Sequence, residues 1–174
     1  MEKQNRIQIL SKAIARITTG LLIILPVASF MIWAKLDWLS AMFRQGYDVS
    51  TFNIKTQAFG ALFSLLPLSI WMYGLYNIRN LFINYAKGRV FLAENARYIK
   101  HFAWMSILGG GLAPVFGGVY SVILSMNHPI GERMLTISLG TTEIQTLLLG
   151  LVFVVIAHVM EDAHSLSEEN NQFV

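Results

Sequence analysis

Four long stretches of this chain are almost free of charge, and this feature constrains the fold more than any other. The first two lie between Arg16 and Lys35 and between Lys55 and Arg79. About 20 apolar residues in an α-helix cross a hydrocarbon core of roughly 30 Å, and an ionised side chain at that depth costs several kcal/mol. The pattern therefore predicts four transmembrane helices, over residues 17–36, 57–79, 102–126 and 136–160.

Composition supports one membrane domain over residues 1–174. Hydrophobic residues make up 55% of the chain, charged residues only 13%, and there is no Cys. These values exclude an ordinary soluble domain, a disordered chain and a disulfide scaffold. We predict an all-α four-helix bundle made of two antiparallel hairpins. A cleaved signal peptide is the competing interpretation of the first segment, but no small-residue cleavage pattern precedes Trp33, which favours a retained helix.

The distribution of Lys and Arg predicts the orientation. Short cytoplasmic loops carry the excess of positive residues. Nine lie on one side: Lys3, Arg6, Lys12, Arg16, Arg79, Lys87, Arg89, Arg97 and Lys100. Four lie on the other: Lys35, Arg44, Lys55 and Arg133. We therefore expect both termini to be cytoplasmic in a multi-pass protein of the bacterial inner membrane, with the basic residues contacting anionic lipid rather than nucleic acid.

The connection after the second segment keeps a helical period, so we expect that helix to continue to about Ala86 and to end at Gly88. Residues 91–95 (Phe-Leu-Ala-Glu-Asn) and 166–170 (Leu-Ser-Glu-Glu-Asn) follow the second and fourth segments at similar distances. Duplication of a helical hairpin would explain this similarity. Chance recurrence of similar polar residues at two helix ends explains it about as well.

Two motifs carry a family resemblance. Residues 85–99 (YAKGRVFLAENARYI) resemble the inner-loop motif, and residues 156–170 (IAHVMEDAHSLSEEN) the C-terminal motif, of a bacterial family of four-span membrane proteins, domain of unknown function 2975. The resemblance implies a small helix-turn-helix regulator as a candidate partner and no enzymatic activity. Glu161, Asp162 and Ala163 depart from the basic residues and glycine that are usual in that family. The expected cytoplasmic-face motif is Lys87, Gly88, Arg89, Phe91, Glu94, Asn95, Arg97, Leu166, Glu168, Glu169 and Asn170.

Glu143 is the one carboxylate at or below a predicted membrane boundary. An acid inside the membrane indicates a proton or cation path, with Thr141, Thr142, Gln145 and Thr146 as polar neighbours. An acid in the first turn of a helix at the outer boundary is the more common case, because negative charge there is stabilised by the helix dipole.

A metal site is a weaker hypothesis. His158 and Glu161 lie three residues apart on one helical face, and His101 opens the third segment at similar depth. Metal sites normally have three or four ligands, and such side chains at a helix end are more often solvated. We therefore predict no metal and no other cofactor, with His101, His158 and Glu161 as the weak candidates.

The third segment is rich in glycine, which lets helices approach closely in lipid. The expected helix-packing residues are Gly109, Gly110, Gly111, Gly117 and Gly118. A broken helix that lines a substrate site, as Gly and Pro114 together permit, is the alternative.

The chain has no nucleophile elbow, phosphate-binding glycine loop or His-Glu-x-x-His motif, so we predict that it is not an enzyme. The leading hypothesis is recognition or regulation through a cytoplasmic face made of the inner loop and the tail. Its expected ion pairs join Arg89, Arg97 and Lys100 to Glu161, Glu168 and Glu169. The alternative is an oligomeric small transporter or channel-like assembly, and the candidate partners are a second copy, another membrane protein or the regulator.

Overall fold

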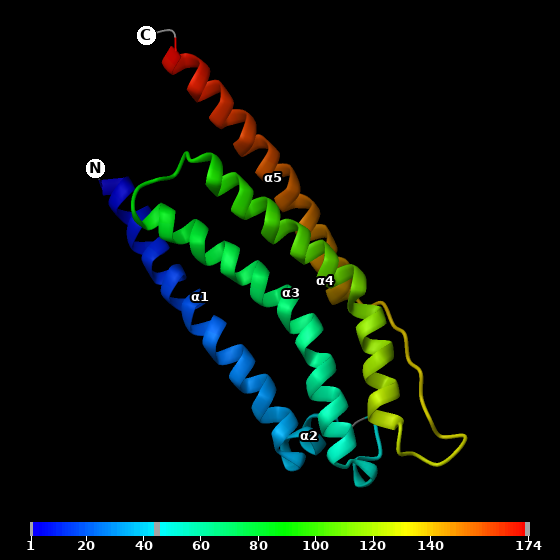
Figure 1. The fold of residues 1–174 in the computed structure, drawn as a ribbon. Coiled ribbons are helices and arrows are strands. Elements are labelled where there is room, and N and C mark those ends of the chain that lie inside the picture. Colours follow the sequence, from blue (N-terminus) through cyan, green and yellow to red (C-terminus); the bar gives the residue numbers. More distant parts are fainter. Residues whose placement is uncertain (1, 44–45, 173–174) are drawn as a thin grey trace.

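A computed structural model describes the backbone of residues 2–43 and 46–172, and their side chains except at 2–4, 36 and 166–172 (Figure 1). The elements in chain order are α1 (Glu2–Ala34), α2 (Leu36–Phe43), the short 3-10 helix η1 (Val49–Thr51), α3 (Ile54–Ala86), α4 (Ala93–Ser125) and α5 (Thr141–Gln172). The all-α prediction is confirmed, since α1, α3, α4 and α5 are long and apolar enough to cross a membrane. A helix satisfies its own backbone hydrogen bonds, which lipid cannot do.

The long helices form an open antiparallel layer in the order α1, α3, α4, α5 (Figure 1). Arg79 Nε donates to Thr19 Oγ1 at 2.8 Å, which joins α1 to α3 near one end of the layer. Each of the other neighbouring pairs packs in the same side-by-side way. The four-helix bundle predicted from the sequence is therefore not closed. Lipid is as apolar as the exposed leucines, so no hydrophobic force drives the outer helices together.

Small side chains line the contacts between these helices. On α3, Thr56, Gly60 and Ser64 recur four residues apart, and all three are buried. A Cβ atom on Gly60 would overlap the ring of Trp33 on α1. Such close approach increases the van der Waals contact that holds helices together in lipid.

The helix ends differ from the predicted spans in several places, among them the start of α4 at Ala93 rather than at residue 102 and the end of α5 at Gln172 rather than at residue 160. Helix α1 begins well before residue 17, and the connection after it contains α2 and η1, which the sequence analysis did not predict. Helix α3 ends at Ala86 as predicted. Helix α5 begins at Thr141 rather than near Thr136.

Residues 132–140, which replace the expected start of the fourth span, are extended and run beside α4 (Figure 1). The backbone N–H of Met134 donates to Ser125 Oγ at 2.9 Å, and that of Thr136 donates to Ser121 Oγ at 2.8 Å. These serine hydroxyls replace bonds that a helix would make internally. As a result, α5 begins beside the middle of α4 rather than beside its end.

The end of the layer that holds α2 has its own apolar cluster, built on Trp33, Leu39, Phe52 and Leu124. Next to it, Asp48 accepts hydrogen bonds from the hydroxyl of Ser50 at 2.7 Å and from its backbone N–H at 3.0 Å. These bonds hold the pKa of the Asp48 carboxyl below its usual value, because they favour the charged form.

Candidate functional site

The candidate site is the turn between α3 and α4, where the inner-loop motif lies. The backbone N–H of Arg89 donates to the carbonyl oxygen of Asn84 at 3.0 Å, which closes the last turn of α3. Gly88 has a φ of +76°, a conformation that L side chains rarely adopt. The predicted role of Gly88 as the helix-ending glycine is therefore confirmed.

A buried pair of asparagines holds this turn from the inside. Asn95 is fully buried, and its Nδ2 donates to the carbonyl oxygens of Arg89 at 2.7 Å and Val90 at 2.9 Å. Its Oδ1 accepts from Nδ2 of Asn84, also at 2.9 Å. Nearby, the hydroxyl of Tyr98 donates to Glu94 at 2.9 Å. Buried polar groups whose bonds are all made fix one conformation of the chain.

The turn presents an aromatic side chain among positive ones. Phe91 is 78% exposed. Lys87, Arg89 and Arg97, which are near it in the sequence, are also exposed. We call these four residues the basic turn surface. Aromatic and arginine side chains are the types most enriched at protein interfaces, so this surface has the composition of a recognition site.

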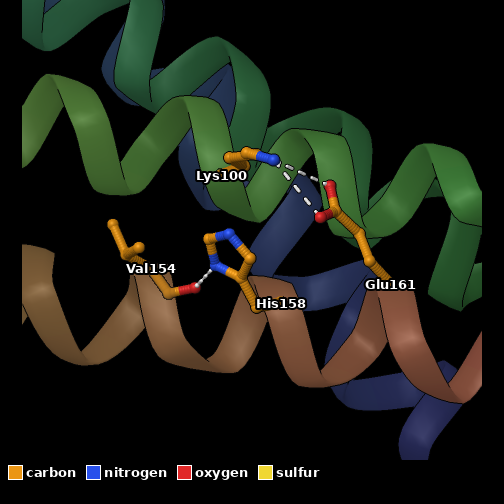
Figure 2. A network of polar contacts seen from close by, with 4 residues as sticks. All are labelled: Lys100, Val154, His158 and Glu161. Carbon is orange, nitrogen blue, oxygen red and sulfur yellow. Dashed lines mark hydrogen bonds and ion pairs between the residues drawn. The ribbon is translucent and has the colours of Figure 1, made fainter.

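The predicted contact between the inner loop and the tail is present at one ion pair. Lys100 Nζ on α4 lies 3.2 Å from each carboxylate oxygen of Glu161 on α5 (Figure 2). Both side chains are about one third exposed, so the pair contributes only about 0 to 1 kcal/mol. The side chains of Leu166, Glu168, Glu169 and Asn170 lie outside the described residues.

The three weak metal candidates have separate partners. His158 Nδ1 donates to the carbonyl oxygen of Val154 on its own helix at 2.8 Å (Figure 2). His101 Nδ1 lies 3.3 Å from Asn77 Oδ1 on α3, and Glu161 bonds to Lys100. Within the part of the chain that the structure describes, no group of three His, Asp or Glu residues is placed to hold a metal ion.

The glycines of α4 contact different neighbours. Helix α4 is continuous from Ala93 to Ser125, so the broken-helix alternative is wrong. A Cβ atom on Gly109 would lie 3.7 Å from Ile70 on α3. One on Gly110 would lie 3.1 Å from Leu147 on α5. These two glycines are therefore at the helix contacts that the sequence predicts.

The other three glycines of the predicted seam behave differently. A Cβ atom on Gly111 would meet Leu147 at 3.9 Å, which is ordinary contact. One on Gly118 would meet Ile137 of the extended segment at 3.0 Å, rather than a facing helix. A Cβ atom on Gly117 would have nothing within 4 Å, so the packing prediction is wrong there. The cause is the late start of α5, which leaves no part of α5 opposite this part of α4.

Glu143 caps the start of α5. Its Oε2 accepts the backbone N–H of Gly140 at 2.8 Å, the bond that an acid three residues into a helix makes to the capping residue. This is the common role that the sequence analysis gave it. Glu143 lies beside the middle of α4, because its carbonyl oxygen would lie 3.2 Å from a Cβ on Gly110.

Sequence reasoning missed two residues that organise these regions. Asn84 is buried and bonds to Asn95, which completes the turn. The sequence signal that could have identified Asn84 is an asparagine eleven residues before Asn95, with the Lys87-Gly88 pair between them. Gly150 on α5 makes the close approach to α4, since its Cβ would lie 3.0 Å from the Ala103 carbonyl oxygen. A single glycine in an apolar helix gave no distinguishing pattern.

Comparison with known proteins gives a family. We found no match among curated proteins and none among solved structures. One family model, described as "Protein of unknown function (DUF2975)", matches residues 32–174. That range contains the whole of α3, α4 and α5, with both motifs that carry the resemblance. Since the match covers far more than half of its residues, this chain belongs to the DUF2975 family of proteins of unknown function.

Proposed function

We propose that this chain is a non-enzymatic recognition or regulatory protein of the bacterial inner membrane. In this proposal the basic turn surface binds an acidic surface on a cytoplasmic partner protein. The observation that carries the proposal is the exposure of Phe91 at the tip of a turn whose backbone is bonded to the buried Asn95. Exposure of an apolar ring to water is unfavourable, and binding a partner would bury the ring.

The partner chemistry follows from the composition of this surface. Three exposed positive side chains and one exposed aromatic ring within eleven residues favour an acidic surface with an apolar pocket. A fixed turn loses little conformational freedom on binding, which improves affinity. A small helix-turn-helix regulator, the partner that the family resemblance implies, is the first candidate. The chain would then act on gene expression through this regulator, without touching nucleic acid itself.

The proposal requires the turn to lie on the cytoplasmic side, which the excess of positive residues favours. With no native Cys, single-cysteine variants give no background labelling. Gly46→Cys, in an exposed loop at the α2 end, should react with a membrane-impermeant maleimide in intact cells. Lys87→Cys, in the turn, should react only after the cells are lysed. The reverse labelling pattern would refute the proposed orientation and the cytoplasmic role of the turn.

Binding is tested by capture of the co-expressed regulator from mild detergent. We expect the triple variant Phe91→Ser, Arg89→Glu, Arg97→Glu to retain about tenfold less regulator than the parent chain, because it removes the aromatic anchor and reverses the charge. Added salt should also weaken capture by the parent chain, because exposed charges are screened.

The matched control places the same kinds of change at the opposite end of the molecule. Ile130 is 96% exposed, and Arg133 and Lys55 are exposed near the same end. The variant Ile130→Ser, Arg133→Glu, Lys55→Glu should capture the regulator as well as the parent chain does. The proposal would be contradicted if both triple variants captured equally less regulator, or if the parent chain captured none.

An oligomeric transporter or channel-like assembly is the second candidate function. It is favoured by a crevice of about 340 Å³ beside Glu143, at the level of the middle of α4. Four helices in an open layer are too few to enclose a path, so this function would need several copies around an axis.

A further inference from the structure

The crevice beside Glu143 has the features of a ligand site. It lies over α4, between α3 and the first turn of α5. Its floor is made of Gly109, Gly110, Ala113 and Gly117, which have little or no side chain. A volume of about 340 Å³ is within the range of small-molecule sites in proteins.

Aromatic side chains line the crevice. Trp71 comes from α3, and Phe116 and Tyr120 come from α4. Phe63 packs edge-on against Phe116 and Tyr120, with ring centroids 5.9 and 5.0 Å apart. These contacts, together with the stacking of Tyr120 on Trp33, fix the orientation of the two α4 rings that line the crevice.

The opposite wall carries one acid. Glu143 lines the crevice together with Thr142 and Thr146. Its Oε2 accepts one backbone N–H, from Gly140. No Lys, Arg or His is among the described residues that line the crevice. A carboxylate in a crevice that is otherwise lined by rings, small residues and threonines attracts a positively charged ligand.

We propose that this crevice binds a small organic cation with aromatic or alkyl substituents, of the quaternary ammonium class. The Glu143 carboxylate would neutralise its charge, and the ring faces would attract the cation and its apolar groups. A bare metal ion fits less well, because it would need several oxygen ligands where the crevice offers rings and glycines. This inference does not depend on the recognition role of the turn.

The test is calorimetric titration of the full chain in lipid nanodiscs with benzyltrimethylammonium. The neutral carbon analogue, neopentylbenzene, has the same shape without the charge. We expect the neutral analogue to bind at least about tenfold more weakly than benzyltrimethylammonium, because it makes neither the ionic contact with the carboxylate nor the cation–π contact with the rings. Equal binding of the two compounds would overturn the proposal, since it would show an apolar crevice only.

Two variants separate the charge from the shape of the site. Glu143→Gln keeps an oxygen that can accept the Gly140 N–H, so the start of α5 is preserved, but it should weaken binding about tenfold. Glu132→Gln removes an acid outside the crevice and should bind as the parent chain does. Gly117→Leu adds bulk to the crevice floor at a position where a Cβ atom meets nothing within 4 Å, and should block binding. Binding that survives both Glu143→Gln and Gly117→Leu would show that the cation does not use this crevice.

Discussion

Replacing Asn95 by leucine is expected to destabilise the protein more than any other single side-chain change in the α3–α4 turn. The substitution removes the partner of the carbonyl oxygens of Arg89 and Val90, and it leaves the amide of Asn84 only its long bond of 3.5 Å to Glu94. Each buried polar group that loses its bond costs about 1 to 3 kcal/mol. Because the bond to Asn84 is buried while the bonds to Arg89 and Val90 are only partly buried, we expect a loss of about 3 kcal/mol.

Thermal unfolding in detergent measures this loss. A change of this size should lower Tm by roughly 6 to 12 °C for a chain of this length. The matched control is Asn80→Leu on α3, where the side chain accepts only one long bond, of 3.3 Å, from the neighbouring Arg79. Its Tm should change by no more than about 2 °C. If Asn95→Leu unfolds at the same temperature as the control, the asparagine pair does not hold the turn.

The two asparagines also show what a sequence can and cannot reveal. Charge-free stretches predicted the four long helices, because the cost of charge in lipid depends on residue type alone. Gly88 predicted the end of α3, because a positive φ is a local property. The bonds from Asn95 to Arg89 and Val90 depend on how two helices meet, and no periodicity encodes that meeting.

The start of α5 is the main feature that could not be predicted. Residues 136–140 are apolar enough to continue a span, and hydropathy alone therefore assigned them to the helix. The extended segment that contains them is bonded through Met134 and Thr136 to the hydroxyls of Ser125 and Ser121, which belong to another helix. This one difference moves Glu143 to the level of the middle of α4, removes the contact expected at Gly117, and leaves room for the crevice.

A glycine on α5, outside the glycine-rich part of α4, makes a close approach to the backbone of α4. A Cβ atom on Gly150 would lie 2.7 Å from Ile107 Cγ1 and 3.0 Å from both the Ala103 carbonyl oxygen and the Ile107 backbone nitrogen. Backbone atoms cannot rotate away as a side chain can, so Gly150→Ala must separate α4 from α5. We expect a loss of about 1 to 3 kcal/mol, the usual range for overpacking, and a fall in Tm of roughly 2 to 12 °C.

The control for this prediction is the same substitution at Gly117, where an added Cβ meets nothing within 4 Å. Alanine is the better helix former by up to about 1 kcal/mol, so Gly117→Ala should raise Tm slightly while Gly150→Ala lowers it. Opposite signs for one chemical change would isolate the effect of close helix approach from that of helix propensity. If both variants gained stability, α4 and α5 would be further apart than the Ala103 carbonyl and Gly150 place them, and the Lys100–Glu161 ion pair would lose its support as well.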